Sequence, residues 1–191
     1  MLKSDLIKVE KPARYMGGEM GARSKECPEI RFVLAFPDVY EVGMSHPGLQ
    51  ILYGAVNDLE WAAAERVYAP WPDMEEMLRR RSTPLASLES DLPLQEADIV
   101  GFTLQYELSY TNILNMLDLA GIPLLARERD EGYPLIIGGG PCACNPEPLA
   151  DFFDAFLLGD GEEAIVEIAA IYRDWKRAGG NWEALLGRLA A

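Results

Sequence analysis

Five short, mostly apolar runs alternate along the chain with longer segments that carry apolar residues on one helical face. The runs occupy residues 31–36, 66–69, 98–104, 134–137 and 156–158. Runs of this kind are typical of strands buried on both faces of a parallel sheet. Because parallel neighbours need right-handed crossover helices, the alternation predicts an α/β fold, a doubly wound parallel sheet of about five strands. The strand at residues 31–36 is expected near its centre.

The segments between the strands show helical periodicity and recognisable ends. Asp73 is expected to cap the second helix, and glycines are expected to end two later helices, at Gly121 and at residues 179–180. Residues 84–90 form a candidate extra strand. Pro47 suits a first helical position, and four apolar residues on one helical face follow it: Leu49, Leu52, Tyr53 and Val56.

The chain divides into three parts. Residues 1–30 are poorly periodic and contain Pro12 and the pair Gly17-Gly18, which indicates an N-terminal extension that is mostly loop. Residues 31–178 hold the alternating pattern and form the predicted α/β domain. Residues 179–191 are predicted to be a C-terminal helix or linker.

Charge and cysteine content exclude several classes of protein. The chain has 31 acidic and 17 basic residues and a net charge of −14, which opposes autonomous nucleic-acid binding because that needs a basic footprint. Cys27, Cys142 and Cys144 are too few for a disulfide framework, and the last two are too closely spaced for a zinc knuckle. No run approaches the roughly 18 apolar residues of a membrane span, and the N-terminus lacks an apolar signal core. We therefore expect a cytoplasmic protein without membrane contact.

Glycine, hydroxyl and charged residues gather where the predicted strands end. Ligands of an open parallel sheet bind beyond these carboxyl ends, so the loop at residues 37–46 is the first candidate site. It contains the single histidine, His46. Later strand ends add the hydroxyl of Thr103, the glycines at 138–140 and a turn with Gly159, Gly161 and Glu162.

Motifs of the common nucleotide and hydrolase sites are missing from these strand ends. The first strand runs into Pro37 and Asp38 where a dinucleotide fold needs G-x-G-x-x-G, and there is no P-loop. Thr103 and Asp160 stand where a phospho-accepting receiver domain needs aspartate and lysine. No G-x-S-x-G elbow supplies a nucleophile. No catalytic residue is assigned, and a small-ligand enzyme of another class is the least favoured interpretation.

Long stretches of the chain closely resemble the N-terminal region of radical S-adenosylmethionine (SAM) proteins that carry a cobalamin-binding domain. They are LAFPDVYEVGMSHPGLQILY, VYAPWPDMEE, VGFTLQYELSYTNILNMLDLAGIPL and IIGGGPCACNPEPLADFFDAFLLGDGEE, and KPARYMGGE resembles it too. The likeness covers nearly the whole chain. It implies a flavodoxin-like (Rossmann-like) domain whose cofactor is cobalamin, with the corrin on the sheet edge and the nucleotide tail in a cleft between strands.

The resemblance also implies which residues meet the cofactor. The loop at residues 38–46 would lie under the corrin, Thr103 would place its hydroxyl near the tail, and Gly138 and Gly139 would lie beside it. With their neighbours at the strand ends, the predicted cofactor-binding residues are Asp38, Val39, Tyr40, Gly43, Ser45, His46, Thr103, Gln105, Tyr106, Gly138, Gly139, Gly140, Pro141, Gly159, Gly161 and Glu162.

Two departures from the family pattern affect the prediction. The D-x-H-x-x-G motif, which supplies a histidine ligand to cobalt in methionine synthase-like proteins, is missing, because Met44 precedes His46 by two positions and Leu49 follows it by three. We expect His46 to cap a helix, with cobalt ligation as the alternative. The C-x-x-x-C-x-x-C iron–sulfur motif is also absent. SAM and a [4Fe–4S] cluster are therefore expected in a radical SAM barrel elsewhere in a larger protein, of which this chain looks like a fragment.

Two functions remain open for the domain. In the first, it holds cobalamin for the radical SAM barrel and has no chemistry of its own. In the second, it is a degenerate scaffold of the same fold that binds no cofactor and docks the barrel. Either function makes the barrel of the same protein the expected partner.

Overall fold

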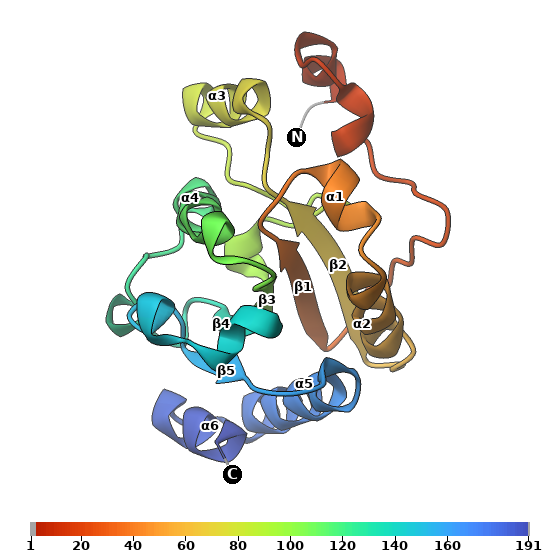
Figure 1. Ribbon diagram of the computed structural model, residues 1–191. Helices are drawn as coiled ribbons and strands as arrows, with labels where there is room; N and C mark the ends of the chain where they lie inside the picture. Colours follow the sequence, from red (N-terminus) through yellow and green to blue (C-terminus); the bar gives the residue numbers. More distant parts are fainter. Residues whose placement is uncertain (1–2, 191) are drawn as a thin grey trace.

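The computed structural model describes residues 3–190, which form a five-stranded sheet with helices on both faces (Figure 1). All strand pairs are parallel, in the order β2-β1-β3-β4-β5. This is the flavodoxin-like order of a doubly wound α/β fold, so the predicted fold class is confirmed. The strands are β1 (Ile30–Phe36), β2 (Ala62–Tyr68), β3 (Ile99–Thr103), β4 (Leu135–Gly139) and β5 (Ala155–Leu157).

Strand β1 lies inside the sheet, as predicted. It pairs with β2 along its whole length and with β3 from Phe32 to Ala35. Every residue of β1 except Arg31 is buried. Both of its faces are covered by helices, and this is why its sequence is a continuous apolar run instead of an alternation.

The helices form two layers that enclose separate apolar cores. Helices α2 (Pro47–Asn57), α5 (Gly161–Ala178) and α6 (Trp182–Leu189) cover the face that carries Phe32 and Leu34. Helices α3 (Pro72–Arg81) and α4 (Tyr110–Ala120) cover the face that carries Val33 and Val100. Helix α1 (Tyr40–Met44) follows β1 at the carboxyl edge. Short 3₁₀ helices complete the fold at Lys3–Lys8, Pro12–Tyr15, Leu94–Glu96, Glu107–Ser109, Ala126–Glu128, Pro141–Cys144 and Glu147–Leu149.

Several local expectations need correction. Strand β2 begins at Ala62, earlier than the predicted 66–69, because the amide of Asn57 bonds both the N–H and the C=O of Ala64 and so supports an otherwise weak alanine stretch. Strand β5 lies one residue earlier than predicted. Residues 84–90 contribute only a single bridge, between Ala86 and Pro93, because proline has no N–H to continue a ladder.

Two further corrections concern helices. Part of the predicted loop 37–46 is helix α1, which begins after an extended Val39. Asp73 does not cap α3, because Pro72 takes the first helical position and Trp71 is the cap residue, without a side-chain bond. Asp73 instead accepts a 2.6 Å bond from the Glu10 backbone N–H. Helices α4 and α5 end before Gly121 and Gly179, as predicted.

The N-terminal extension docks on the carboxyl edge of the sheet. The Arg14 side chain is buried, lies over the ring of Trp71 at 4.6 Å and pairs with Glu41 of α1 at 2.9 Å. The hydroxyl of Tyr15 accepts the Trp71 N–H at 3.0 Å. Residues 1–2 of the predicted extension and residue 191 of the predicted C-terminal segment lie outside the described residues. Within residues 3–190, no helix has the length and apolar character that a membrane crossing requires.

The ion pair of Glu41 predicts acid-sensitive docking of the extension. The hydrogen bond from Arg14, helped by one from Lys11, lowers the pKa of Glu41 from an ordinary 4.5 to about 2. Since the folded pKa is the lower one, the carboxylate stabilises docking above pH 4.5 and loses this contribution as the pH falls towards 2. The Glu41 side chain is 44% exposed, so solvent screening keeps the effect small.

Thermal unfolding of Glu41→Gln and wild type as a function of pH checks this prediction. We expect the variant to melt lower than wild type at neutral pH, and the difference to shrink steadily below pH 4.5. Glu131→Gln, at an exposed position, is the control and should match wild type throughout. A difference between Glu41→Gln and wild type that is independent of pH would contradict the prediction.

Candidate functional site

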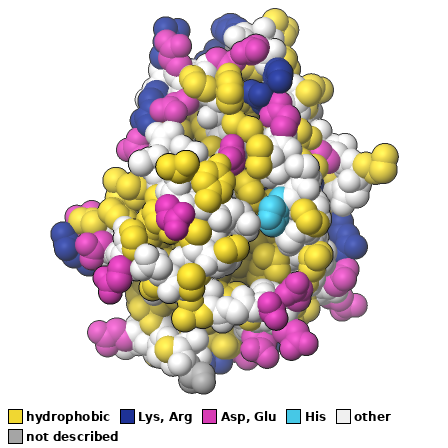
Figure 2. All heavy atoms as spheres, in the orientation of Figure 1, with side chains coloured by type: hydrophobic (Ala, Val, Ile, Leu, Met, Phe, Trp, Pro, Cys, Tyr) yellow, Lys and Arg dark blue, Asp and Glu magenta, His cyan; other side chains and the backbone are white. Residues whose placement is uncertain are grey.

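A cleft opens between the sheet and helices α2 and α5 at the carboxyl edge. Its volume is about 230 Å³. In Figure 2 the single histidine lies beside a hollow whose surface is largely hydrophobic. The cleft is lined by Phe32, Leu34, His46, Gly48, Leu49, Leu52, Gly101, Phe102, Thr103, Gln105, Ile137, Gly138, Gly139, Gly140, Leu157, Gly159, Asp160, Gly161, Glu162, Ile165 and Ile168.

The floor of the cleft is made of strand residues that point to one face of the sheet. Thr103, Gly139 and Leu157 stand side by side in register across β3, β4 and β5. The row below contains Gly101 and Ile137. Each of these two rows contains one glycine, Gly139 or Gly101, which places no side chain on the floor, while α2 and α5 supply apolar walls. The result is an apolar slot with a hydroxyl at its open end.

The three glycines after β4 have different physical roles. A Cβ on Gly138 would lie 2.9 Å from Leu104, so that glycine is required by packing. Gly140 has φ +119°, which other residues rarely adopt, and a Cβ there would lie 2.9 Å from the Leu104 carbonyl oxygen. A Cβ on Gly139 would meet only Leu157, at an ordinary 3.6 Å. Gly139 is therefore the position where the missing side chain leaves free space in the cleft.

The N-terminus of α5 forms the other side of the cleft mouth. Gly161 is its first residue, and a Cβ there would lie 3.1 Å from Leu52, so glycine allows α5 to approach α2 closely. Asp160 is the cap residue and makes no side-chain capping bond, which leaves first-turn N–H groups without a side-chain partner. Glu162 follows Gly161, and its charge and that of Asp160 make the mouth unfavourable for di- or triphosphates.

His46 caps helix α2, as expected. Its Nδ1 accepts the Leu49 backbone N–H at 3.2 Å, and its ring lies 5.2 Å from that of Phe36. A neutral imidazole that accepts at Nδ1 carries its proton on Nε2. Nε2 is then a hydrogen-bond donor.

The other predicted residues of the 38–46 loop lie outside the cleft. Asp38 accepts a hydrogen bond from the Tyr106 hydroxyl and so links the loops after β1 and β3. Val39 and Tyr40 line a second cavity of about 150 Å³ beside the N-terminal extension. Ser45 is exposed and donates to the Glu41 and Val42 carbonyl groups.

Two more predicted residues have local structural surroundings. Gly43 is buried against Tyr68, whose ring atoms would be 2.3 Å from an added Cβ. Pro141 is the exposed first residue of the 3₁₀ helix after Gly140. The structure thus brings together nine of the sixteen predicted residues in one cleft: His46, Thr103, Gln105, Gly138, Gly139, Gly140, Gly159, Gly161 and Glu162.

Sequence reasoning missed the apolar walls and one glycine of the floor. Leu49, Leu52, Ile165 and Ile168 line the cleft, although their helical pattern indicates core packing. Gly101 had a usable signal, since glycine inside a strand often marks close approach of a ligand or another chain segment. Its Cβ would lie 2.9 Å from the ring of Phe32, so part of that space is already filled. Among the described residues, no group of three or more His, Cys, Asp and Glu side chains could hold a metal ion.

Residues 48–191 match the family described as radical SAM proteins, N-terminal. The chain belongs to this family. The sequence resemblance to the N-terminal region of radical SAM proteins is thereby confirmed, and the fold above is that of a radical SAM N-terminal domain.

The chain spans only a small part of the length of two proteins that it resembles. An uncharacterized protein of Methanocaldococcus jannaschii is 31% identical over 90 residues, which cover 46% of this chain and 18% of that protein. A radical S-adenosylmethionine methyltransferase, TsrM, from Kitasatospora setae was solved with its tryptophan substrate and a SAM analog. It has a TM-score of 0.46 and 17% identity, and the match covers 75% of this chain and 26% of that one.

The glycine roles predict different outcomes for two neighbouring alanine substitutions. Gly140→Ala should destabilise the fold by about 1–3 kcal/mol, because it combines a positive φ with a contact to a backbone oxygen. Gly139→Ala should change stability by less than about 0.5 kcal/mol. Urea unfolding of both variants checks this, and equal losses at the two positions would show that the roles are assigned wrongly.

Proposed function

We propose that this domain binds cobalamin over the carboxyl edge of its sheet, as one part of a larger radical SAM protein, and performs no chemistry alone. The observation that carries the proposal is the cleft that Gly139 leaves open between the sheet and helices α2 and α5. The nucleotide tail of the cofactor would occupy this cleft. When bound, cobalamin supplies a cobalt centre able to carry a methyl group.

The chemistry of the cleft suits that tail. Its apolar walls and floor match a flat aromatic base, which gains from burial against leucine and isoleucine. Thr103 offers a hydroxyl, and the first turn of α5 offers N–H donors for polar groups of the ribose. The acidic residues at the mouth of the cleft disfavour the binding of polyphosphates. In this proposal the α/β unit of residues 31–178 is the binding unit, and SAM and the [4Fe–4S] cluster belong to the rest of the protein.

The geometry of His46 favours a cobalamin that is not ligated by histidine. A histidine that binds a metal through one ring nitrogen almost always donates a hydrogen bond from the other. His46 instead accepts a bond at Nδ1, from the Leu49 N–H. Ligation through Nε2 would require loss of that cap or an imidazolate. His46 is therefore assigned to helix capping at the edge of the site, under the corrin.

A scaffold that docks the radical SAM barrel without a cofactor is the second candidate. Large apolar side chains stand exposed on this domain near the carboxyl ends, namely Leu158 at 67%, Leu108 at 87% and Tyr106 at 40%. Either a corrin or another protein domain would cover them. The cleft favours the first candidate, because docking a domain does not require an open slot beneath the surface.

Cobalamin binding is tested by adding hydroxocobalamin to the purified chain, desalting, and recording the visible spectrum. We expect retained cobalamin in wild type and a loss of affinity greater than about tenfold in Gly139→Val, because the side chain fills the cleft. Thr103→Ala removes one hydrogen bond, worth roughly 0.5–1.5 kcal/mol, and should cost less. Gly139→Ala, with its single methyl group, is the matched control for folding. If wild type retains no cobalamin even with the rest of the protein present, the docking scaffold becomes the function.

The histidine assignment has its own test. His46→Asn keeps a side-chain acceptor for the Leu49 N–H, whereas His46→Ala removes the cap at about 1 kcal/mol. Both variants should bind cobalamin with a visible spectrum nearly identical to that of wild type. A large spectral shift in His46→Asn would establish cobalt ligation and leave the cobalamin proposal intact.

A further inference from the structure

We propose that Arg66 of β2 is a positioning residue for residues 40–50, the segment beside the cleft. Its buried side chain holds helix α1 and the start of α2 in place. The consequence of this positioning for cobalamin binding rests on the proposed function. The positioning itself is a property of the chain that can be measured without any cofactor.

Helix α1 has limited apolar anchorage, because only Tyr40 and Met44 pack against the core and both are partly buried. It is five residues long, and Gly43 is its one fully buried residue. Its outer side is held by the N-terminal extension, through the Arg14 pair with Glu41 and a 3.2 Å bond from the Tyr40 hydroxyl to Glu19. Its inner end, Met44, precedes His46 by two residues, so whatever fixes Met44 also fixes the rim of the cleft.

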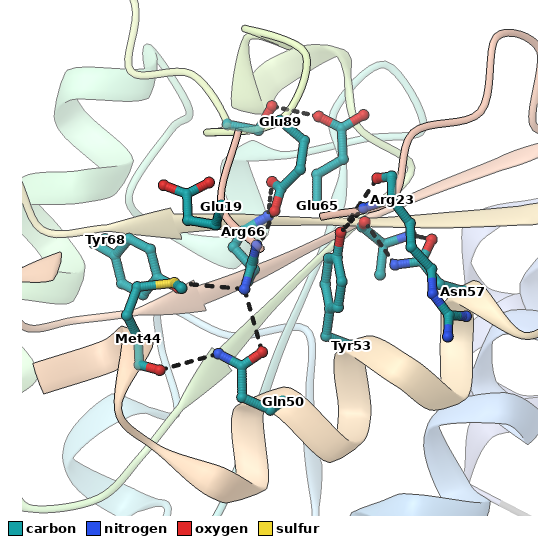
Figure 3. A network of polar contacts seen from close by, with 12 residues as sticks. Glu19, Arg23, Met44, Gln50, Tyr53, Asn57, Glu65, Arg66, Tyr68 and Glu89 are labelled. Carbon is teal, nitrogen blue, oxygen red and sulfur yellow. Dashed lines mark hydrogen bonds and ion pairs between the residues drawn. The ribbon is translucent and has the colours of Figure 1, made fainter. Parts of the chain in front are cut away.

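Arg66 reaches this inner end from a buried ion pair. Its side chain is 2% exposed and donates from Nε to Glu89 Oε1 at 2.7 Å, and the Glu89 side chain is also 2% exposed. The guanidinium carbon lies 4.3 Å from the centre of the Tyr53 ring. Figure 3 shows Arg66 between Glu89 above and Gln50 below, with Met44 and Tyr53 on either side. These contacts fix the plane of the guanidinium group.

The Nη1 group of Arg66 contacts both helices, α1 and α2. Its Nη1 donates to Gln50 Oε1 of α2 at 3.2 Å and approaches the Met44 sulfur of α1 at 3.4 Å. Gln50 in turn donates from Nε2 to the Met44 carbonyl oxygen at 3.1 Å. The Tyr68 hydroxyl donates to the same sulfur at 2.9 Å. Both the side chain and the backbone of Met44 are thus set by β2 and α2.

Stability alone does not account for this arrangement. Apolar residues of similar volume often replace a buried ion pair without loss of stability. Here one donor, Nη2 of Arg66, is buried without a hydrogen-bond partner, which is unfavourable. The guanidinium group makes directed bonds to Met44 and Gln50, which an apolar side chain cannot make. The structure therefore assigns Arg66 to holding the loop geometry.

Hydrogen exchange of the cofactor-free chain tests the proposal directly. Arg66→Lys keeps a positive charge for Glu89 but has no fork to reach Met44 and Gln50. We expect exchange of the amides at residues 40–46 to rise about tenfold, while amides of β4 and α5 stay unchanged. The control is Arg129→Lys, at a second buried arginine that pairs with Asp154 at 2.9 Å and bonds the Phe152 carbonyl. It should leave residues 40–46 unaffected.

Gln50→Glu is the second variant, in case Arg66→Lys disturbs the fold. The new carboxylate still accepts from Arg66 but cannot donate to the Met44 carbonyl, so faster exchange at 40–46 is again expected. If neither variant loosens residues 40–46, or if Arg129→Lys loosens them equally, the positioning role is wrong. Cobalamin titration then separates the two proposals. Weaker binding in both variants supports the link to the site, unchanged binding with faster exchange refutes that link, and no binding in wild type refutes the proposed function alone.

Discussion

Coverage of both faces of a parallel sheet is the constraint on which the rest of this structure depends. Helices cover both faces of the five parallel strands, so the inner strands β1, β3 and β4 are almost entirely apolar. Polar groups are then confined to the ends of the strands and to the outer edges of the sheet. Polar and potentially ligand-binding residues gather at the carboxyl ends, and the cleft forms where Gly139 places no side chain on the inner face.

The outer edge at β2 shows how an edge strand is completed without another strand. The Asn57 amide bonds both backbone groups of Ala64, and the Lys25 ammonium group donates to the Ala62 carbonyl. The Arg66 backbone N–H donates to the Glu89 carboxylate, and the Arg66 backbone C=O accepts the Leu88 N–H. Side chains thus satisfy much of the edge that would otherwise invite pairing with another chain. The same carboxylate orients the Arg66 guanidinium towards the loop beside the cleft, so edge protection and site geometry share one residue.

The cleft depends on small residues at selected positions. Gly139 leaves the floor open and Gly161 lets α5 approach α2, whereas Gly138 and Gly140 serve the packing and the turn. A cofactor carrier needs such a fixed slot more than it needs reactive groups, because the cofactor brings the chemistry and the protein supplies position.

The sequence by itself determined the fold class, the inner place of β1, the helix ends at Gly121 and Gly179, and the strand ends as the place of the candidate cleft. All of these follow from local apolar periodicity and from residues whose backbone preferences act within a few positions. The tertiary structure decided the start of β2, the helix within residues 37–46, the capping bond of His46, and which glycine opens the cleft. Each of these depends on a partner distant in the chain or on the direction of one bond. The sequence does not distinguish the roles of the three consecutive glycines. Only their distances to Leu104 and Leu157 in the structure show that the roles differ.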